Sequence, residues 1–425
     1  MSVRRRGLIF GVVLLAYAVV LRIYPERAAL ALGTTAFVAF LPQHLATVSQ
    51  VGNDVLAELL FAAVLYILVS WVISTRDMGR GSTRTYAEIS ESYPRSHLHC
   101  SKRSAVQVSA LIRVLMGLLL GLILITKTTA YIAVPLAGGV LVWRWWRERA
   151  SARRIVADAL LIVLPVMLLA LPWYARDVAV YGWPDFLGLN RHDQIVVGQT
   201  RTGEFLAQVG WNAYMRRALE FTFKSFWGVF GWLGVFMDSR VYFLLALLSG
   251  VAAGGLLLRI ADRRSRIGDS VAVQSAMPET SGHAVRNRKS AITLLGLSVL
   301  LTLLTYAWYN TQFVQHQGRY LFTALIPFAL AFAAGWEAAL WPRASRILAV
   351  AMIVLLVVLA AWGELSHMGL PKWPVMITAV LAAVLFFASW LPRKLQPVLF
   401  AAPYALFVLL DLYALFKAIG PQLAR

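Results

Sequence analysis

Apolar stretches long enough to cross a membrane recur along this chain from end to end. The hydrocarbon core of a bilayer is about 30 Å thick, so a helix needs about 20 mainly apolar residues to cross it. Hydrophobic residues make up 60% of the 425 residues and charged residues only 14%, which excludes an ordinary soluble domain. The sequence therefore predicts an all-α polytopic integral membrane protein, a single transmembrane domain over residues 1–425 with about 11–12 transmembrane helices.

The formal net charge is +20, and most Lys and Arg residues lie in connections between apolar stretches, chiefly residues 75–103, 144–154 and 259–289. An even number of predicted spans separates each of these connections from the next. All three can therefore lie on the cytoplasmic side, where Lys and Arg are in excess. No separate basic domain exists to bind DNA, so the charge does not indicate a nucleic-acid partner.

The two long cytoplasmic connections, about residues 75–104 and 260–290, lack apolar periodicity and are expected to be disordered. This orientation leaves one long external connection, about residues 176–240, which is rich in Trp, Phe and Gly. Its segment EFLAQVGWNAYMRRALEFTFKSFWGVFGW is expected to form interfacial helices with aromatic faces at the headgroup level. The single Cys100 excludes an internal disulfide and a multi-cysteine metal site.

The same count of spans places the N-terminus outside, in conflict with the basic run Arg4, Arg5 and Arg6. Three interpretations are open. The first apolar segment is a signal peptide, although AYA at residues 16–18 is a poor cleavage site. Alternatively, residues 28–46, which Gly33 and Pro42 interrupt, form a re-entrant segment. The interpretation that we favour is that further spans once preceded this chain.

Several polar residues at the predicted external edge come from different spans and can form one site. Asp54 opens a span in QVGNDVLAELL, as a helix N-cap, as a catalytic carboxylate, or as both. Lys127 in LITKTTAYIAVP either extends its ammonium group from a helix end or binds an anion, and Arg319 opens a later span in QHQGRYLF. Ionisable residues at such depth are functional candidates by default. The other candidates at this edge are Arg176, Arg191, His192, His316 and Gln317.

A site with several cations and few carboxylates suits a lipid phosphate. Arg and Lys bind the phosphate, and a carboxylate acts as a base or orients an acceptor. No Walker motif, HExxH or GxSxG is present, which argues against nucleotide-driven and serine-hydrolase chemistry. The sequence does not identify a cofactor, and a divalent metal is compatible with the pattern but is not indicated by it.

Five segments of the chain resemble the GT-C class of polytopic glycosyltransferases, which includes protein mannosyltransferases and aminoarabinose transferases. In family order, these segments are FLPQHLATVSQVGNDVLAELL, LILITKTTAYIAVPLAG, LPWYARDVAVYGWPDFLG, FKSFWGVFGW and HQGRYLFTALIPFALAFAAGW. The resemblance covers most of the chain. It implies transfer of a sugar from a polyprenyl-phosphate donor to a glycan, lipid or protein acceptor, on the external face of the bacterial cytoplasmic (inner) membrane.

The resemblance also implies roles for individual residues. Asp54 matches an acidic residue that lines the catalytic cavity, and Lys127 matches a lysine that approaches the donor phosphate. His316, Gln317 and Arg319 match the QGRY element, which contacts phosphate or sugar. Arg176, Arg191 and His192 lie in the external connection and match less closely.

The sequence also departs from the pattern of the class. Members of the class begin with a helix and a large external loop that carries an acidic motif, and this sequence has no such loop. Its first span aligns best with about the third span of the class. A truncated gene product, a mis-assigned start and a catalytically silent relative all fit this departure. The alternative functions are a non-catalytic or transport protein that binds lipid-linked glycans, for which no internal repeat is present, and a purely structural membrane protein.

Overall fold

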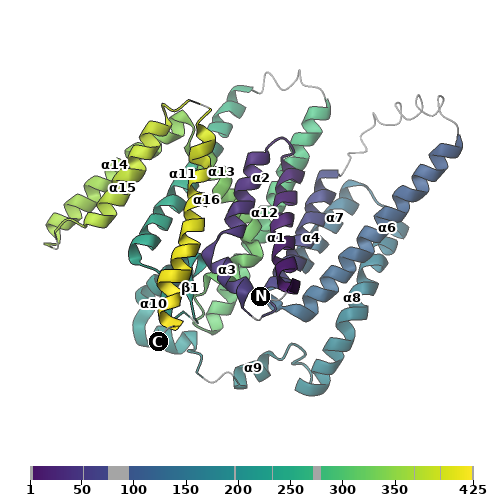
Figure 1. Cartoon of the computed structure of the whole chain (residues 1–425). Helices are drawn as coiled ribbons and strands as arrows, with labels where there is room; N and C mark the ends of the chain where they lie inside the picture. The colour runs from purple at the N-terminus through teal and green to yellow at the C-terminus, as the bar shows by residue number, and fades with distance from the viewer. Residues whose placement is uncertain are drawn as a thin grey trace.

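Long apolar helices dominate the structure, a computed structural model (Figure 1). The structure describes residues 3–50, 52–74, 95–195, 198–231, 233–270, 279–367, 369–392 and 394–423. Within these residues the only strands are β1 (Val229–Phe230) and β2 (Val235–Phe236), which pair antiparallel. The predicted all-α polytopic membrane fold is confirmed.

Eight helical segments are long and apolar enough to span a membrane among the described residues. Five of them lie in or make up α4 (Asp54–Ser74), α6 (Arg95–Thr126), α8 (Ala152–Tyr181), α11 (Ser239–Ser270) and α12 (Glu279–Gln312). The others are η3 (Gly318–Ala324) with α13 (Leu325–Ala339), α14 (Pro342–Leu365), and α16 (Gln396–Tyr413) with η4 (Ala414–Ile419) and α17 (Gly420–Leu423).

Shorter apolar helices complete the bundle. They are α1 (Val3–Ile23), of which Gly7–Ile23 is apolar, and α15 (Lys372–Ala388). The bent pair α2 (Ala28–Ala39) and α3 (Pro42–Ser49) adds up to one further span. The predicted total of about 11–12 spans includes these elements. It also includes the segment that forms α7 (Ala133–Arg147), a helix of only 15 residues.

The bend between α2 and α3 is a local consequence of Pro42. Leu41, which precedes the proline, is extended, and Pro42 occupies the first turn of α3. Proline disfavours a helical conformation at the preceding residue and fits the first turn of a helix. The chain therefore turns by 54° between the two helices. The prediction that Gly33 interrupts this segment is wrong. Gly33 lies inside α2, where a Cβ would overlap the side chains of Phe400 and Tyr404.

Ion pairs connect several chain segments at one end of the bundle, which we call the basic end. Arg27 and Arg259 both pair with Glu337 of α13. Arg288 of α12 pairs with Glu26 at 3.1 Å, and Arg343 of α14 lies 3.8 Å from Asp262 of α11. The basic connections that these residues represent thus lie together, as the predicted topology requires.

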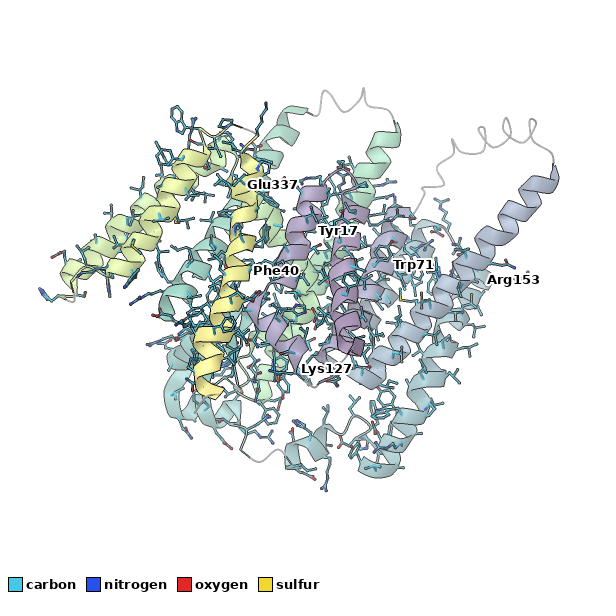
Figure 2. All side chains as sticks on the ribbon, in the orientation of Figure 1. Tyr17, Phe40, Trp71, Lys127, Arg153 and Glu337 are labelled. Carbon is cyan, nitrogen blue, oxygen red and sulfur yellow. The ribbon has the colours of Figure 1, made fainter. Side chains whose placement is uncertain are left out.

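The opposite end of the bundle carries the connection predicted to be external. It contains α9 (Leu189–Ile195), the β1–β2 hairpin and α10 (Thr202–Trp227), which is kinked at Gly210 (φ 76°). η1 (Thr128–Ala130) and α3 also lie at this end (Figure 1). Glu337 lies toward the upper end of the bundle and Lys127 toward the lower end in Figure 2.

Helix continues further into the long basic connections than the hydropathy predicted. α6 already begins at Arg95, α11 continues to Ser270 and α12 begins at Glu279. Backbone hydrogen bonds can continue beyond the apolar part of a helix, so polarity alone does not end it. These helical parts extend into the connections that were expected to be disordered, and residues 75–94 and 271–278 lie outside the described residues.

An aromatic cluster forms part of the buried core. Phe37 of α2 lies with its ring centroid 5.6 Å from Trp227, 5.0 Å from Phe332 and 5.6 Å from Phe407. These residues are buried and come from α2, α10, α13 and α16. Because aromatic rings bury a large area in defined geometries, the cluster fixes α10, α13 and α16 relative to α2.

Candidate functional site

Asp54 and Lys127 meet where two helices end at the same level. α6 ends at Thr126, and Lys127 follows in an extended conformation. Asp54 is the first residue of α4, where a carboxylate is favoured by the helix dipole. The side-chain amide of the preceding Asn53 donates to the carbonyl of Thr126 at 2.6 Å, which ties the two helix ends together. The Lys127 ammonium forms an ion pair with the Asp54 carboxylate.

Arg319 approaches Asp54 and Lys127 from η3. Gly318 allows this approach, because it lets η3 pack closely on α10. A Cβ at position 318 would overlap the backbone of Phe226 and Thr222 in α10, so only glycine allows this close approach. The Gly318 N–H donates to the hydroxyl of Ser225 at 2.7 Å. The GR pair of the QGRY motif thus has a physical basis, since the glycine docks η3 on α10 and the next residue extends toward the pocket.

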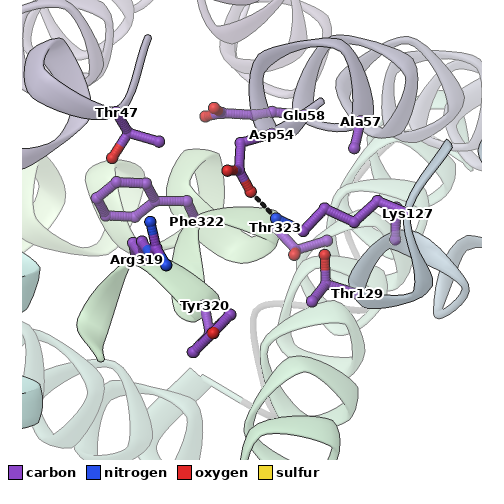
Figure 3. Close-up of a pocket in the computed structure, with 11 residues that line it drawn as sticks. Thr47, Asp54, Ala57, Glu58, Lys127, Thr129, Arg319, Tyr320, Phe322 and Thr323 are labelled. Carbon is purple, nitrogen blue, oxygen red and sulfur yellow. Dashed lines mark ion pairs between the residues drawn. The ribbon is translucent and has the colours of Figure 1, made fainter. Parts of the chain in front are cut away.

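Asp54, Lys127 and Arg319 line one pocket at the end opposite the basic end (Figure 3). The free cavity between these side chains measures only about 30 Å³, well below the usual range for ligand sites. Helix α3, helix α4, the η1 turn and the η3 turn supply its walls. The remaining lining residues are Thr47, Ala57, Glu58, Thr129, Ala130, Tyr320, Phe322 and Thr323.

Charge is balanced in this pocket, since two basic and two acidic side chains line it. Burial and the neighbouring Arg319 lower the pKa of Lys127 from its ordinary value of 10.5 to about 8. The contact with the Asp54 carboxylate favours the charged ammonium. An anion entering the pocket would meet the Lys127 and Arg319 cations together.

His316 and Gln317 immediately precede η3, but they are not lining residues of the pocket. Both are buried, and the His316 ring packs edge-to-face on Tyr214 at 5.0 Å. Burial, with Arg217 nearby, lowers the pKa of His316 to about 4, so this imidazole is neutral at physiological pH. Their position supports the turn that carries Arg319.

The other predicted residues lie away from the pocket. Arg176 is half exposed on α8, over the ring of Trp173, and it pairs with the adjacent Asp177 at 3.0 Å. Arg191 and His192 are exposed on α9, where His192 lies 5.8 Å from the ring of Phe313. The structure therefore brings together Asp54, Lys127 and Arg319, and it does not bring Arg176, Arg191 or His192 to them.

Sequence reasoning missed Glu58, the second acidic residue of the pocket. It follows Asp54 by four residues in DVLAE, which places both carboxylates on one face of α4. That spacing was a usable signal. Tyr320 and Thr323 follow Arg319 in η3, and Thr47 belongs to α3, whose approach depends on the bend at Pro42.

No cluster of three or more His, Cys, Asp or Glu residues that could hold a metal is found in the described part of the chain. No family model, no curated protein and no solved structure matches the chain.

Proposed function

We propose that this protein is a membrane glycosyltransferase that moves a sugar from a polyprenyl-phosphate donor to a glycan, lipid or protein acceptor. The main support for this proposal is the pocket lined by two cations and two carboxylates, at the end of the bundle opposite the basic end. These residues are Lys127, Arg319, Asp54 and Glu58. Cytoplasmic connections are enriched in Lys and Arg, so the opposite end faces the exterior. For a bacterial protein, this is the external face of the cytoplasmic membrane.

The composition of the pocket suits a lipid-linked phosphate. The Arg319 guanidinium can bind phosphate oxygens in a bidentate way, and the Lys127 ammonium adds a point charge. The pocket lies at the end of apolar helices that can accompany a polyprenyl chain in the bilayer. Two carboxylates beside two cations allow one group to accept a proton while the cations stabilise the departing phosphate.

The first test measures donor-lipid binding and sugar transfer by the full chain in lipid nanodiscs. A panel of polyprenyl-phosphate sugars, including mannose and aminoarabinose donors, is offered with a total envelope extract as the source of acceptors. Transfer of radiolabelled sugar by the wild-type chain is the expected result. Absence of transfer from every donor, with polyprenyl phosphate still bound, would overturn the proposal in favour of a binding protein.

Variants of the cations then test the pocket itself. Lys127→Ala and Arg319→Ala are each expected to weaken polyprenyl-phosphate binding by about tenfold or more, because each removes a charge-assisted hydrogen bond. Lys372→Ala is the matched control, since Lys372 is an exposed cation at the start of α15 and outside the pocket. Equal binding by all three variants and the wild-type chain would contradict a phosphate site at this pocket.

A further inference from the structure

A buried histidine connects α3 to α4 behind the pocket. His44 Nδ1 lies 2.7 Å from the carbonyl oxygen of Val38, and His44 Nε2 lies 3.1 Å from Glu58 Oε2. The His44 side chain is fully buried, and the Glu58 side chain is 10% exposed. The Phe322 ring, which also lines the pocket, packs edge-to-face on the imidazole at 5.7 Å.

The two contacts of the imidazole define its protonation. A backbone carbonyl only accepts hydrogen bonds, so Nδ1 carries a proton and donates it to Val38. In a neutral imidazole Nε2 is then bare, and a bare nitrogen cannot bond to an ionised carboxylate. The contact with Glu58 therefore needs one further proton, held either by Nε2 or by the carboxyl group. Both forms of the pair carry no net charge, which makes its burial far less costly than that of a lone ion.

The second oxygen of Glu58 is left for a ligand. Glu58 Oε1 is buried and has no hydrogen-bond partner among the described residues, although Glu58 lines the pocket. A buried acceptor without a donor costs free energy, which a hydroxyl group placed in the pocket would recover. Asp54 differs from Glu58 in this respect, because its carboxylate is in an ion pair with Lys127.

We infer that Glu58 is the general base that activates the acceptor hydroxyl, that His44 positions it, and that Asp54 holds Lys127 in place. This assignment rests on the proposed transferase function and changes the role that sequence reasoning gave to Asp54. It also defines the acceptor chemically, as a hydroxyl group delivered to Glu58 Oε1.

The step balances as a single displacement. Glu58 Oε1 takes the hydroxyl proton while the hydroxyl oxygen forms a bond to the anomeric carbon of the donor sugar. The bond from that carbon to the phosphate oxygen breaks, and its electron pair leaves with the polyprenyl phosphate. Lys127 and Arg319 stabilise the extra negative charge on this leaving group. The anomeric configuration is inverted, and Glu58 later releases its proton to water.

The groups that face the pair come from three elements. Asp54 lies one turn before Glu58 on α4, Lys127 follows α6, and Arg319 with the Tyr320 hydroxyl comes from η3. His44 has no contact with the pocket opening, because it is fully buried behind Glu58. It is therefore a positioning residue that holds the carboxylate and keeps the second proton on Nε2, so that Glu58 is ionised and can act as a base.

Kinetics of Glu58→Gln and Asp54→Asn separate the two carboxylates. General-base catalysis contributes about 100-fold or more, so Glu58→Gln is expected to lower kcat by at least that factor with donor binding unchanged. Asp54→Asn is expected chiefly to raise the donor KM. Glu364→Gln is the control, since Glu364 is exposed on α14. Near-normal kcat in Glu58→Gln, measured in an active wild-type background, overturns this inference and leaves the proposed function standing.

His44→Gln tests the positioning role. This variant is expected to lower kcat, to leave the donor KM unchanged and to shift the pH profile of kcat. A purely structural role would lower the amount of folded protein without shifting that profile, which would overturn the assignment of His44.

A second readout does not need activity. Nitrogen-15 NMR of labelled histidines, with His44→Gln to assign the resonance, is expected to show both ring nitrogens of His44 protonated. A neutral ring, protonated at one nitrogen only, would overturn the assignment of Glu58 as an ionised base. If the wild-type chain transfers no sugar at all, the proposed function and the base assignment both fail, whatever the NMR result.

Discussion

Lys127 shows how a single residue at a helix end acquires its properties from neighbours that are distant in sequence. Its ammonium pairs with the Asp54 carboxylate of α4, and Arg319 from η3 lines the same pocket. Burial disfavours the charged form and Arg319 repels it, which together lower the pKa to about 8. The free pocket thus holds a cation that can titrate near neutral pH.

We expect polyprenyl-phosphate binding to weaken as the pH rises through about 8. Below this value Lys127 is charged, and above it the affinity falls by up to about tenfold per pH unit, because only the ammonium form attracts the phosphate. Lys127→Arg keeps its charge at every pH and should remove this dependence. Titrations of polyprenyl-phosphate affinity at about pH 6.5 to 9.5 measure this pH dependence. An equally steep fall in affinity in the Lys127→Arg variant would show that Lys127 is not its cause.

The same shift has the opposite effect on folding stability. The pKa of Lys127 is lower in the folded chain than its ordinary value, so the folded state loses this proton first. The cost of burying the charge is present below about pH 8 and is relieved as the pH rises toward 10.5. Stability from this residue therefore rises with pH while phosphate binding falls.

Helix packing in the bundle depends on small residues. Gly335 of α13 faces Gly255 and Ala252 of α11, and a Cβ at position 335 would overlap the backbone carbonyl of Ala252. Small residues let helices approach closely in a membrane, where helix association gains little from the hydrophobic effect. The contact fixes α13, the helix into which η3 continues directly.

Gly335→Ala is expected to destabilise the protein by about 1–3 kcal/mol, since the added methyl group forces α11 and α13 apart. Thermal unfolding in detergent, followed by circular dichroism, measures the change. Gly296→Ala is the matched control, because a Cβ at position 296 of α12 would have open space around it. Equal unfolding temperatures for the two variants would refute the close α11–α13 contact.

At the scale of the whole molecule, the two ends of the bundle are chemically different. Arg27, Arg259, Arg288 and Arg343 form ion pairs at the basic end. The candidate pocket, α9 and α10 occupy the other end. From the positive-inside bias, we expect a bundle with this asymmetry to have a defined orientation in the bilayer, with the proposed pocket on the external side.

Cysteine labelling tests the orientation. In a Cys100→Ser background, Asn190→Cys in α9 should react with a membrane-impermeant maleimide on intact cells. Arg343→Cys, which replaces an exposed residue at the basic end, should react only after permeabilisation. The reverse pattern would place the pocket in the cytoplasm and exclude transfer on the external face.

The sequence by itself determined which segments are helical and membrane-spanning, and which end carries the basic connections. Hydropathy and charge report depth in the membrane, and depth was enough to place Asp54, Lys127 and Arg319 at one edge. Depth says nothing about lateral neighbours. The tertiary structure decided that these three residues share a pocket, that Arg176, Arg191 and His192 lie elsewhere, and that Glu58 meets His44. Lateral position depends on side-chain packing between helices, on close contacts such as Gly318 with α10, and on the bend at Pro42 that carries His44 to α4.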